Sequence, residues 1–428
     1  MNKTRQDESL TLGRPMRILI ITQYFPPEMG APQARLFELA SRLIKKGNEV
    51  TVLTAMPNYP TGRVFNAYRG LLRVVEYMEG VRVVRTAIYP SKSSRAIPRL
   101  LSNFSFILTS ILLGGVNLKR FDVTLVESPP LFIAPAGWLI SRLKSTQSIF
   151  MVSDVWPDIL VRMGYVQPGF NLKAMLWLEQ WAYRHHDIVA LTNPGAMKQL
   201  NSRFPNLKTT VISNGVDTTF FHPSFRSEKA RNELDAGNNT FLVGYCGLHG
   251  LAQGLGAVLD AADLLRDHLN IQFVMIGEGP VKQDLMSEAK ARGLNNIRFL
   301  CQRPKKEMPS ILASCDSLLV PLLVELPGTM PSKIYEALAS GAPPIVAKGC
   351  EGESLVEQYK AGFTYTPMSG EEMAQAVLDL ANNPELHQEM IKRAVKLARR
   401  FDRGVLADRT ELILRAIVSG KRLPEVVW

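Results

Sequence analysis

The 428-residue chain has little cysteine, no Asp-x-Asp triplet and no uninterrupted apolar run of about 20 residues. Its four cysteines, Cys246, Cys301, Cys315 and Cys350, show neither CxxC nor metal-ligand spacing, and three adjoin apolar runs. This pattern predicts buried, reduced thiols in a cytosolic protein and excludes a disulfide framework. Because the acidic triplet that would bridge a divalent ion to phosphates is missing, we expect no metal and no other cofactor.

Basic charge is in excess, but only in one half of the chain. Residues 1–195 carry 23 Lys and Arg against 13 Asp and Glu, whereas residues 196–428 carry 27 against 26. The basic residues are scattered and do not form a tract interleaved with aromatics, which argues against a nucleic-acid partner. An anionic membrane surface fits the field of the first half better, and a simple contribution to solubility remains the alternative.

Membrane-like sequence is scarce. The apolar run at residues 18–21 is too short for a signal-peptide core. Residues 100–116 form a seventeen-residue stretch without charge, although it contains several Ser, Thr and Asn side chains. A span needs about 20 residues, so we expect a packed or interfacial helix, with a transmembrane helix as the alternative. We expect a cytoplasmic protein that is peripheral on the inner face of the cytoplasmic membrane.

Buried strands followed by amphipathic helices recur along the chain. In the first half, strands are predicted at 16–21, 49–53, 82–86, 123–126, 148–152 and 188–191, with a helix at 32–46. In the second half, strands are predicted at 241–245, 271–276, 297–300, 317–320 and 345–347, with a helix at 255–269. We therefore predict an α/β protein of two doubly wound, Rossmann-like domains facing each other across a cleft.

The join between the halves falls in residues 210–223, and a last helix at 405–419 is long enough to cross back. We expect the N-terminal domain to comprise residues 1–212 together with 404–428. The C-terminal domain then comprises residues 213–403. Each half opens with a glycine-containing strand-to-helix loop, which is where such folds bind ligands.

The stretch LPGTMPSKIYEALASGAPPIVA, residues 326–347, combines a Gly/Pro loop, a short helix and a buried strand. The helix is predicted to open near Pro331 or Ser332, with Ser332 available as a cap. Free amides at that helix start and the charge of Lys333 would suit a phosphate, and Glu336 could accept hydrogen bonds from sugar hydroxyls. The alternative is an exposed Lys–Glu helix pair.

The pieces ITQYFPPEMGAP, ISNGVDTTFFHP, GYCGLHGLAQGL, IGEGP and MPSKIYEALASGAPPIVA occur in this order. In order and spacing the chain resembles GT-B glycosyltransferases of the retaining family 4, most closely the bacterial enzymes of O-antigen, capsule and exopolysaccharide synthesis. The resemblance spans about residues 16–415. It implies a C-terminal domain that grips a nucleotide-sugar donor and an N-terminal domain that presents the acceptor.

The same resemblance assigns site residues. Glu336 would bind the ribose, the loop from Gly328 to Lys333 would hold the diphosphate, and Gly30 would let amides approach from the opposite wall. The full donor-binding set is Gly30, Gly247, His249, Gln253, Gly277, Glu278, Gln302, Arg303, Gly328, Thr329, Met330, Pro331, Ser332, Lys333 and Glu336.

The chain departs from the family pattern at two places. The Arg and Lys of the usual G-R-x4-K-G turn are replaced by Leu248 and Gln253. The E-x7-E pair keeps Glu336, but its first position holds Gly328, and Glu325 is a misplaced substitute. Lys333 is expected to replace part of the missing charge.

The catalytic candidates are Lys333, for the leaving diphosphate, and Asp154, for the acceptor hydroxyl, with Asp158 as a second choice. Asp154 follows a predicted strand, and its alternative role is a helix cap. His249 lies in the second glycine turn, where it could touch phosphate. His185 and His186 lack partner ligands, so we expect no metal site there.

We therefore predict a retaining glycosyltransferase that moves a sugar from a nucleotide-sugar, UDP-linked rather than GDP-linked, to a polyprenyl-diphosphate-linked saccharide in cell-surface polysaccharide synthesis. A UDP-sugar 2-epimerase is the alternative enzyme, since it shares the two-domain fold. A catalytically inactive scaffold that binds nucleotide-sugar is the non-enzymatic alternative, suggested by Gly328, Leu248 and Gln253.

Overall fold

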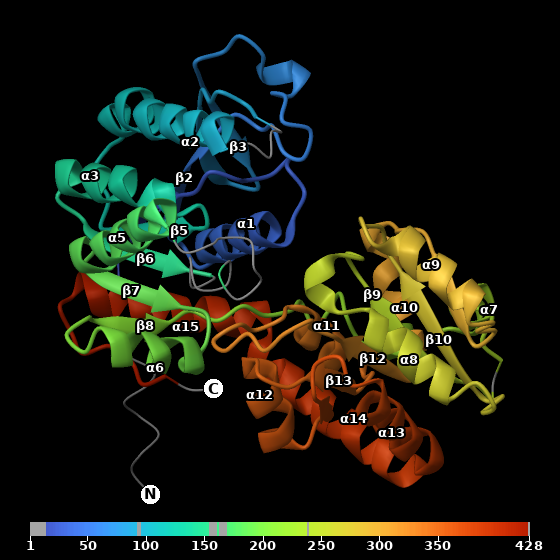
Figure 1. Ribbon diagram of the computed structural model, residues 1–428. Helices are drawn as coiled ribbons and strands as arrows, with labels where there is room; N and C mark the ends of the chain where they lie inside the picture. Colours follow the sequence, from blue (N-terminus) through green and yellow to red (C-terminus); the bar gives the residue numbers. More distant parts are fainter. Residues whose placement is uncertain (1–13, 92–95, 154–160, 162–168, 238, 427–428) are drawn as a thin grey trace, which may run out of the picture.

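The computed structural model describes residues 14–91, 96–153, 161, 169–237 and 239–426. The chain forms two α/β lobes, each built on its own sheet (Figure 1). This is the predicted arrangement of two Rossmann-like domains.

The N-terminal sheet has eight strands in the order β3-β4-β2-β1-β5-β6-β7-β8, and every pairing except β3–β4 is parallel. Five of its inner strands are almost entirely buried, because helices cover both faces of a parallel sheet. The strands are β1 (Arg17–Ile21), β2 (Glu49–Ala55), β3 (Arg73–Met78), β4 (Val81–Thr86), β5 (Val123–Ser128), β6 (Gln147–Val152), β7 (Ile188–Leu191) and β8 (Thr209–Val211).

Successive strand residues face two separate cores. Leu19 and Ile21 belong to one core, which is covered by α2, α3, α5 and α6, while Ile18 and Ile20 belong to the other, which is covered by α1 and α15. The helices of this lobe are α1 (Ala31–Lys45), α2 (Ala96–Thr109), α3 (Ala134–Lys144), α5 (Phe170–His185) and α6 (Pro194–Arg203), with short turns η2 (Asn66–Tyr68), η3 (Ser110–Gly114), η4 (Gly115–Asn117) and η5 (Leu131–Ile133).

The C-terminal sheet has six strands in the order β11-β10-β9-β12-β13-β14, all parallel. The strands are β9 (Phe241–Cys246), β10 (Ile271–Ile276), β11 (Ile297–Leu300), β12 (Ser317–Val320), β13 (Pro344–Ala347) and β14 (Phe363–Tyr365). The helices are α7 (Glu228–Glu233), α8 (Gly256–Leu264), α9 (Lys282–Ala291), α10 (Met308–Ser314), α11 (Lys333–Ser340), α12 (Glu351–Tyr359), α13 (Gly370–Asn382) and α14 (Pro384–Ala398), with turns η6 (Pro223–Phe225), η7 (Leu251–Gln253), η8 (Lys305–Glu307) and η9 (Arg399–Phe401).

The last helix, α15 (Arg403–Val418), returns to the N-terminal lobe (red in Figure 1). Its residues Ile413, Leu414 and Ile417 join the core that contains Ile18 and Leu36. The Asp402 side chain accepts from the Gly404 N–H and so caps the helix at the point of crossing.

Three strands were not predicted: β3, β8 and β14. β3 alternates in exposure and contains charged residues, as expected of an antiparallel edge strand that has one face in water. β8 and β14 have only three residues each, too few for a period to show. The helix predicted at 255–269 ends at Leu264, because turns, including a hydrogen bond from the His268 N–H to the Leu265 carbonyl, return the chain to β10.

The uncharged segment at 100–116 is helical throughout, running from α2 into the π-helical turn η3 and then η4. Gly114 and Gly115 bring it onto the sheet, since a Cβ at Gly114 would lie 2.5 Å from Leu53 Cδ1. Residues Leu100–Asn117 are long and apolar enough to span a membrane, and 28% of that window is buried in the protein. By length and composition alone this is weak evidence of a span.

Candidate functional site

Lys333 lies at the carboxyl edge of the C-terminal sheet, where β9 ends. A Cβ at Gly247, directly after β9, would lie 2.3 Å from Lys333 Cε and 2.4 Å from Nζ. The ammonium group is 5.9 Å from the centre of the Tyr245 ring. Glycine at 247 therefore lets the lysine side chain lie across the end of β9, half-buried and directed along the edge where α/β sheets bind ligands.

The start of α11 differs from the prediction in two respects. The helix begins at Lys333, with Ser332 as N-cap, and the Ser332 side chain makes no capping hydrogen bond because the residue already has helical dihedral angles. Among the described residues, the amides of Ser332 and Lys333 have no hydrogen-bond acceptor. Two free N–H groups thus lie at the start of the helix whose first residue is Lys333, and free amides of this kind form anion sites.

Glu336 lies one turn into α11 and is half-buried. Burial raises the pKa of its carboxyl group, and the nearby charges of Lys333, Arg403 and Lys305 oppose that rise. No hydrogen bond to this carboxylate occurs among the described residues. Arg403 begins α15, so Glu336 is influenced by the segment that crosses between the lobes.

His249 and the glycines Gly277 and Gly279 are structural. The His249 side chain is fully buried, and burial lowers its pKa, with Lys282 lowering it further. A Cβ at Gly277 would lie 1.8 Å from the Gly247 carbonyl oxygen, and one at Gly279 would lie 2.2 Å from the His249 carbonyl oxygen. Contact between His249 and phosphate stays a prediction, and in this structure the buried His249 side chain packs beneath the strand-end loops. Gly277 is needed because two strand-end loops pack backbone to backbone.

Glu278, Gln302 and Arg303 follow neighbouring strands, as predicted for a base pocket. The exposed Glu278 carboxylate accepts from Lys282 Nζ at 2.9 Å and from the Gln302 backbone N–H, which lower its pKa. Lys282 is itself buried and also donates to the carbonyls of Gly277 and Leu300. Gln302 is exposed, and Arg303 lies 3.9 Å from Glu307.

The loop before α11 contacts the N-terminal lobe, which the sequence did not predict. Asn193, the N-cap of α6, donates through Nδ2 to the Gly328 carbonyl oxygen at 2.9 Å. The Glu351 carboxylate accepts from the backbone N–H groups of Gly328 and Gly195. Gly328 and Thr329 are thus occupied by protein contacts, and Met330 is buried in the core. Of the predicted diphosphate loop, Gly328 and Met330 are buried, Thr329, Pro331 and Lys333 are half-buried, and Ser332 is exposed.

Burial raises the pKa of the Glu351 carboxyl group above its ordinary value of 4.5, more than the hydrogen bonds lower it. The native protein then binds a proton more tightly than the unfolded chain, so this group's contribution to the free energy of unfolding falls as pH rises above 4.5 through the native pKa. The free energy of unfolding changes by about 1.4 kcal/mol for each pKa unit that separates the native and unfolded states. We expect Glu351→Gln, which does not titrate, to gain stability relative to the wild type between pH 4.5 and 7 in urea unfolding. Parallel stability curves would contradict this.

The NGVD motif marks the crossing between the lobes. A Cβ at Gly215 would lie 2.1 Å from the Phe401 carbonyl oxygen, and Val216 pairs with Asp402 as an isolated bridge. Asn214 accepts from Arg35 Nη1 at 2.7 Å. Arg35 also bonds Glu127 and Ser153 at the ends of β5 and β6. The sequence did not reveal this cluster, because its members come from four distant segments.

The remaining predicted residues are dispersed. Gly30 is the exposed N-cap of α1, where a Cβ would meet only the Gln33 side chain. Gln253 ends η7 and is half-buried. Glu325 is exposed and covers Gly349. Asp154 and Asp158 lie outside the described residues. No group of three or more His, Cys, Asp or Glu with metal-binding geometry occurs in the part of the chain that the structure describes.

Each lobe matches a family model of glycosyltransferases. Residues 226–397 match glycosyl transferases group 1, and residues 30–215 match the glycosyl transferase 4-like domain. The chain is a glycosyltransferase with the GT-B fold. The matched ranges divide the chain at residues 216–225, next to the crossing at Gly215 and Val216.

Individual relatives are distant. WcaI of Escherichia coli strain K12, named for a role as glycosyl transferase in colanic acid biosynthesis, is 27% identical over 77% of this glycosyltransferase and 83% of WcaI. Two solved structures share the fold: sucrose-phosphate synthase of Thermosynechococcus elongatus, with a TM-score of 0.74 at 15% identity, and HepE of Anabaena in complex with UDP-glucose, with a TM-score of 0.69 at 19% identity. Each superposition covers 95% of this chain and 100% of the solved chain.

Proposed function

We propose that the enzyme transfers a sugar from a UDP-sugar to a polyprenyl-diphosphate-linked saccharide, with retention at the anomeric carbon, in cell-surface polysaccharide synthesis. The observation that carries the donor part is the start of α11 at the carboxyl edge of the sheet, where two amides are free and the Lys333 side chain lies against Gly247. The UDP-glucose complex of HepE and the colanic acid role in the name of WcaI are consistent with this donor and this pathway.

The residues of the site suggest a division of roles. Lys333 and the amides of Ser332 and Lys333 would stabilise the leaving diphosphate without a metal ion. Glu336 would accept hydrogen bonds from the ribose, since its carboxylate has no hydrogen-bond partner among the described residues. Glu278 and Gln302 would lie beside the base. We retain Asp154 as the proposed partner of the acceptor hydroxyl.

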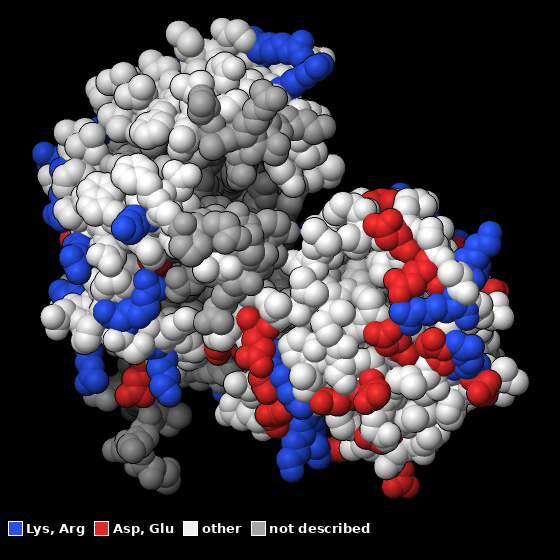
Figure 2. All heavy atoms as spheres, in the orientation of Figure 1, with Lys and Arg blue, Asp and Glu red and all other residues white. Residues whose placement is uncertain are grey.

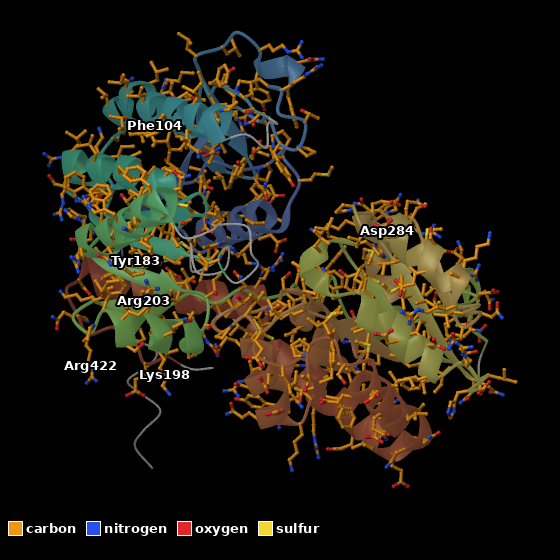
Figure 3. The ribbon with its side chains drawn as sticks, viewed as in Figure 1. Phe104, Tyr183, Lys198, Arg203, Asp284 and Arg422 are labelled. Atoms are coloured by element: carbon orange, nitrogen blue, oxygen red, sulfur yellow. The ribbon has the colours of Figure 1, made fainter. Side chains whose placement is uncertain are left out.

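We also propose that the enzyme works at the cytoplasmic membrane surface, where a lipid-linked acceptor resides. The outward side chains of α2 and η3 are apolar: Leu101, Phe104, Leu108 and Leu112 are 52–63% exposed and follow helical spacing. Figure 2 shows a largely uncharged surface over α2, and Phe104 is labelled on this helix in Figure 3. A contiguous exposed apolar stripe on a monomer indicates an interaction surface.

Incubation with labelled UDP-, GDP- and dTDP-sugars plus bacterial membrane lipid extract tests the proposal. We expect label from a UDP-sugar to enter the organic phase. A changed sugar nucleotide formed from donor alone would favour the epimerase alternative. Tight donor binding with neither transfer nor donor hydrolysis would indicate an inactive scaffold.

The membrane proposal predicts that Leu101→Ser/Leu108→Ser binds phospholipid vesicles at least about tenfold more weakly than wild type in a flotation assay, because each exposed leucine would bury apolar area in the bilayer boundary. Leu264→Ser/Leu269→Ser is the matched control, since these leucines of the C-terminal lobe are 55% and 90% exposed. Equal losses in the two variants would contradict a specific role for α2.

A further inference from the structure

A pocket of about 330 Å³ lies in the N-terminal lobe, apart from the donor site. Its floor and walls come from the ends of β2 and β4 and from the loop that carries η2. Its lining includes Arg63, Tyr68, Arg69, Leu71, Ile88 and Pro90. The volume is within the range of small-molecule sites. Neither the family motifs nor the proposed donor site makes use of it.

The pocket has a surplus of positive charge. Arg63 and Arg69 are exposed, and neither guanidinium has a carboxylate partner among the described residues. The acid beside the pocket is Glu76, which already pairs with the fully buried Arg85 and accepts from Tyr68 Oη at 3.0 Å. Figure 2 shows basic side chains over the η2 loop at the top of the view. Two free guanidinium groups at one opening suit the planar, bidentate recognition of phosphate.

The opposite wall is apolar and continues into α2. Ala87, Ile88 and Pro90 line the pocket. Their segment is held against α2, because the Tyr89 N–H donates to Ser105 Oγ at 2.8 Å and Thr109 Oγ1 donates to the Ala87 carbonyl. The exposed apolar stripe of α2 and η3 therefore begins beside the pocket. An arginine-lined opening next to a lipid-facing helix is complementary to an amphiphile with a phosphorylated head group.

The pocket also lies at the edge of the N-terminal sheet that contacts the C-terminal lobe. It lies after β2 and β4, at the same carboxyl edge as β7, whose following residue Asn193 contacts Gly328 of the C-terminal lobe. A saccharide attached to a head group in the pocket can extend along this edge toward that lobe.

We propose that this pocket is the acceptor-anchoring subsite, in which Arg63 and Arg69 bind the diphosphate of an isoprenoid-linked saccharide while Leu71, Ile88 and Pro90 contact its first isoprene units. The inference rests on the proposed lipid-linked acceptor and locates where that acceptor is held. It adds a phosphate site that is independent of Lys333.

The test measures binding of farnesyl diphosphate to the full-length protein by calorimetry, with inorganic pyrophosphate and phosphatidylglycerol vesicles as separate probes. Arg63→Gln/Arg69→Gln is compared with Lys421→Gln/Arg422→Gln, which removes the same charge at the far end of the lobe (Figure 3, Arg422). We expect the first variant to bind farnesyl diphosphate at least about tenfold more weakly, with UDP binding unchanged, because charge-assisted bonds to both arginines are lost. We expect the control to match wild type.

In wild type, pyrophosphate should bind more weakly than farnesyl diphosphate, since it lacks the isoprenoid contacts. Equal farnesyl diphosphate binding by all three proteins would overturn the inference. The inference would also be overturned if Arg63→Gln/Arg69→Gln lost phosphatidylglycerol vesicle binding as strongly as farnesyl diphosphate binding. That result would show a general attraction to anionic surfaces. If no sugar is transferred to lipid but farnesyl diphosphate binding still depends on Arg63 and Arg69, the proposed function fails and the subsite stands.

Discussion

Replacing Lys333 with alanine is expected to lower kcat/KM for the nucleotide-sugar at least about thirtyfold, which corresponds to about 2 kcal/mol of transition-state stabilisation. Charge accumulates on the leaving diphosphate as the glycosidic bond breaks, and the Lys333 ammonium is the cation that lies against Gly247 at this edge. Without it, two amides at the start of α11 would have to neutralise that charge. The measurement is steady-state transfer with a saturating acceptor.

Lys306→Ala is the matched control, because Lys306 is exposed in the same lobe and forms no ion pair among the described residues. It should leave kcat/KM within about twofold of wild type. Glu336→Ala should lower kcat/KM by a factor similar to that for Lys333→Ala. This factor should be smaller with donors that contain 2′-deoxyribose or 3′-deoxyribose, because those donors lack a hydroxyl that Glu336 would bind. Near-normal turnover in both Lys333→Ala and Glu336→Ala would end the donor-site assignment.

Replacing Gly277 with alanine is expected to lower the free energy of unfolding by roughly 2–4 kcal/mol, because the new methyl group would have to displace backbone. The ideal Cβ position is 1.8 Å from the Gly247 carbonyl oxygen and 3.1 Å from His249 Nδ1. The Gly277 φ of +149° adds strain for any residue with a side chain. Urea denaturation followed by circular dichroism measures the change.

Gly237→Ala in the same lobe provides the comparison, since a Cβ there would have only the Thr240 hydroxyl near it, at 3.7 Å. It should change stability by less than about 0.5 kcal/mol. If both variants unfold at the same urea concentration, the packing of the β9 and β10 loops against each other is not what requires glycine at 277.

Much of the secondary structure followed from local pattern. Strands β10, β11 and β12 were predicted to the residue, because each is a short, mainly apolar run. β12 is buried along its whole length, whereas the edge strand β11 exposes Arg298. Edge strand β3 was missed, since half of its residues face water. The Lys333 and Glu336 positions on α11 also followed from sequence, because residues three apart lie on one helix face.

Contacts between distant segments could not be predicted in the same way. Gly277 of the IGEGP motif was predicted to line the base pocket, and in the structure its position is packed against the Gly247 carbonyl. Glu351 belongs to none of the motifs singled out in the sequence, yet its carboxylate accepts hydrogen bonds from Gly195 of one lobe and Gly328 of the other. Nothing near residue 351 in the chain encodes that position.

The amino-acid sequence alone determined the two Rossmann-like domains and the helix that carries Lys333, because apolar period and glycine placement act over a few residues. Its ordered motifs also carried the resemblance to glycosyltransferases. Tertiary structure alone decided which glycines serve packing, that Gly328 and Glu351 join the lobes, and that Arg63 and Arg69 share an opening with an apolar wall. Those properties depend on distances between segments tens to hundreds of residues apart, and only folding sets these distances.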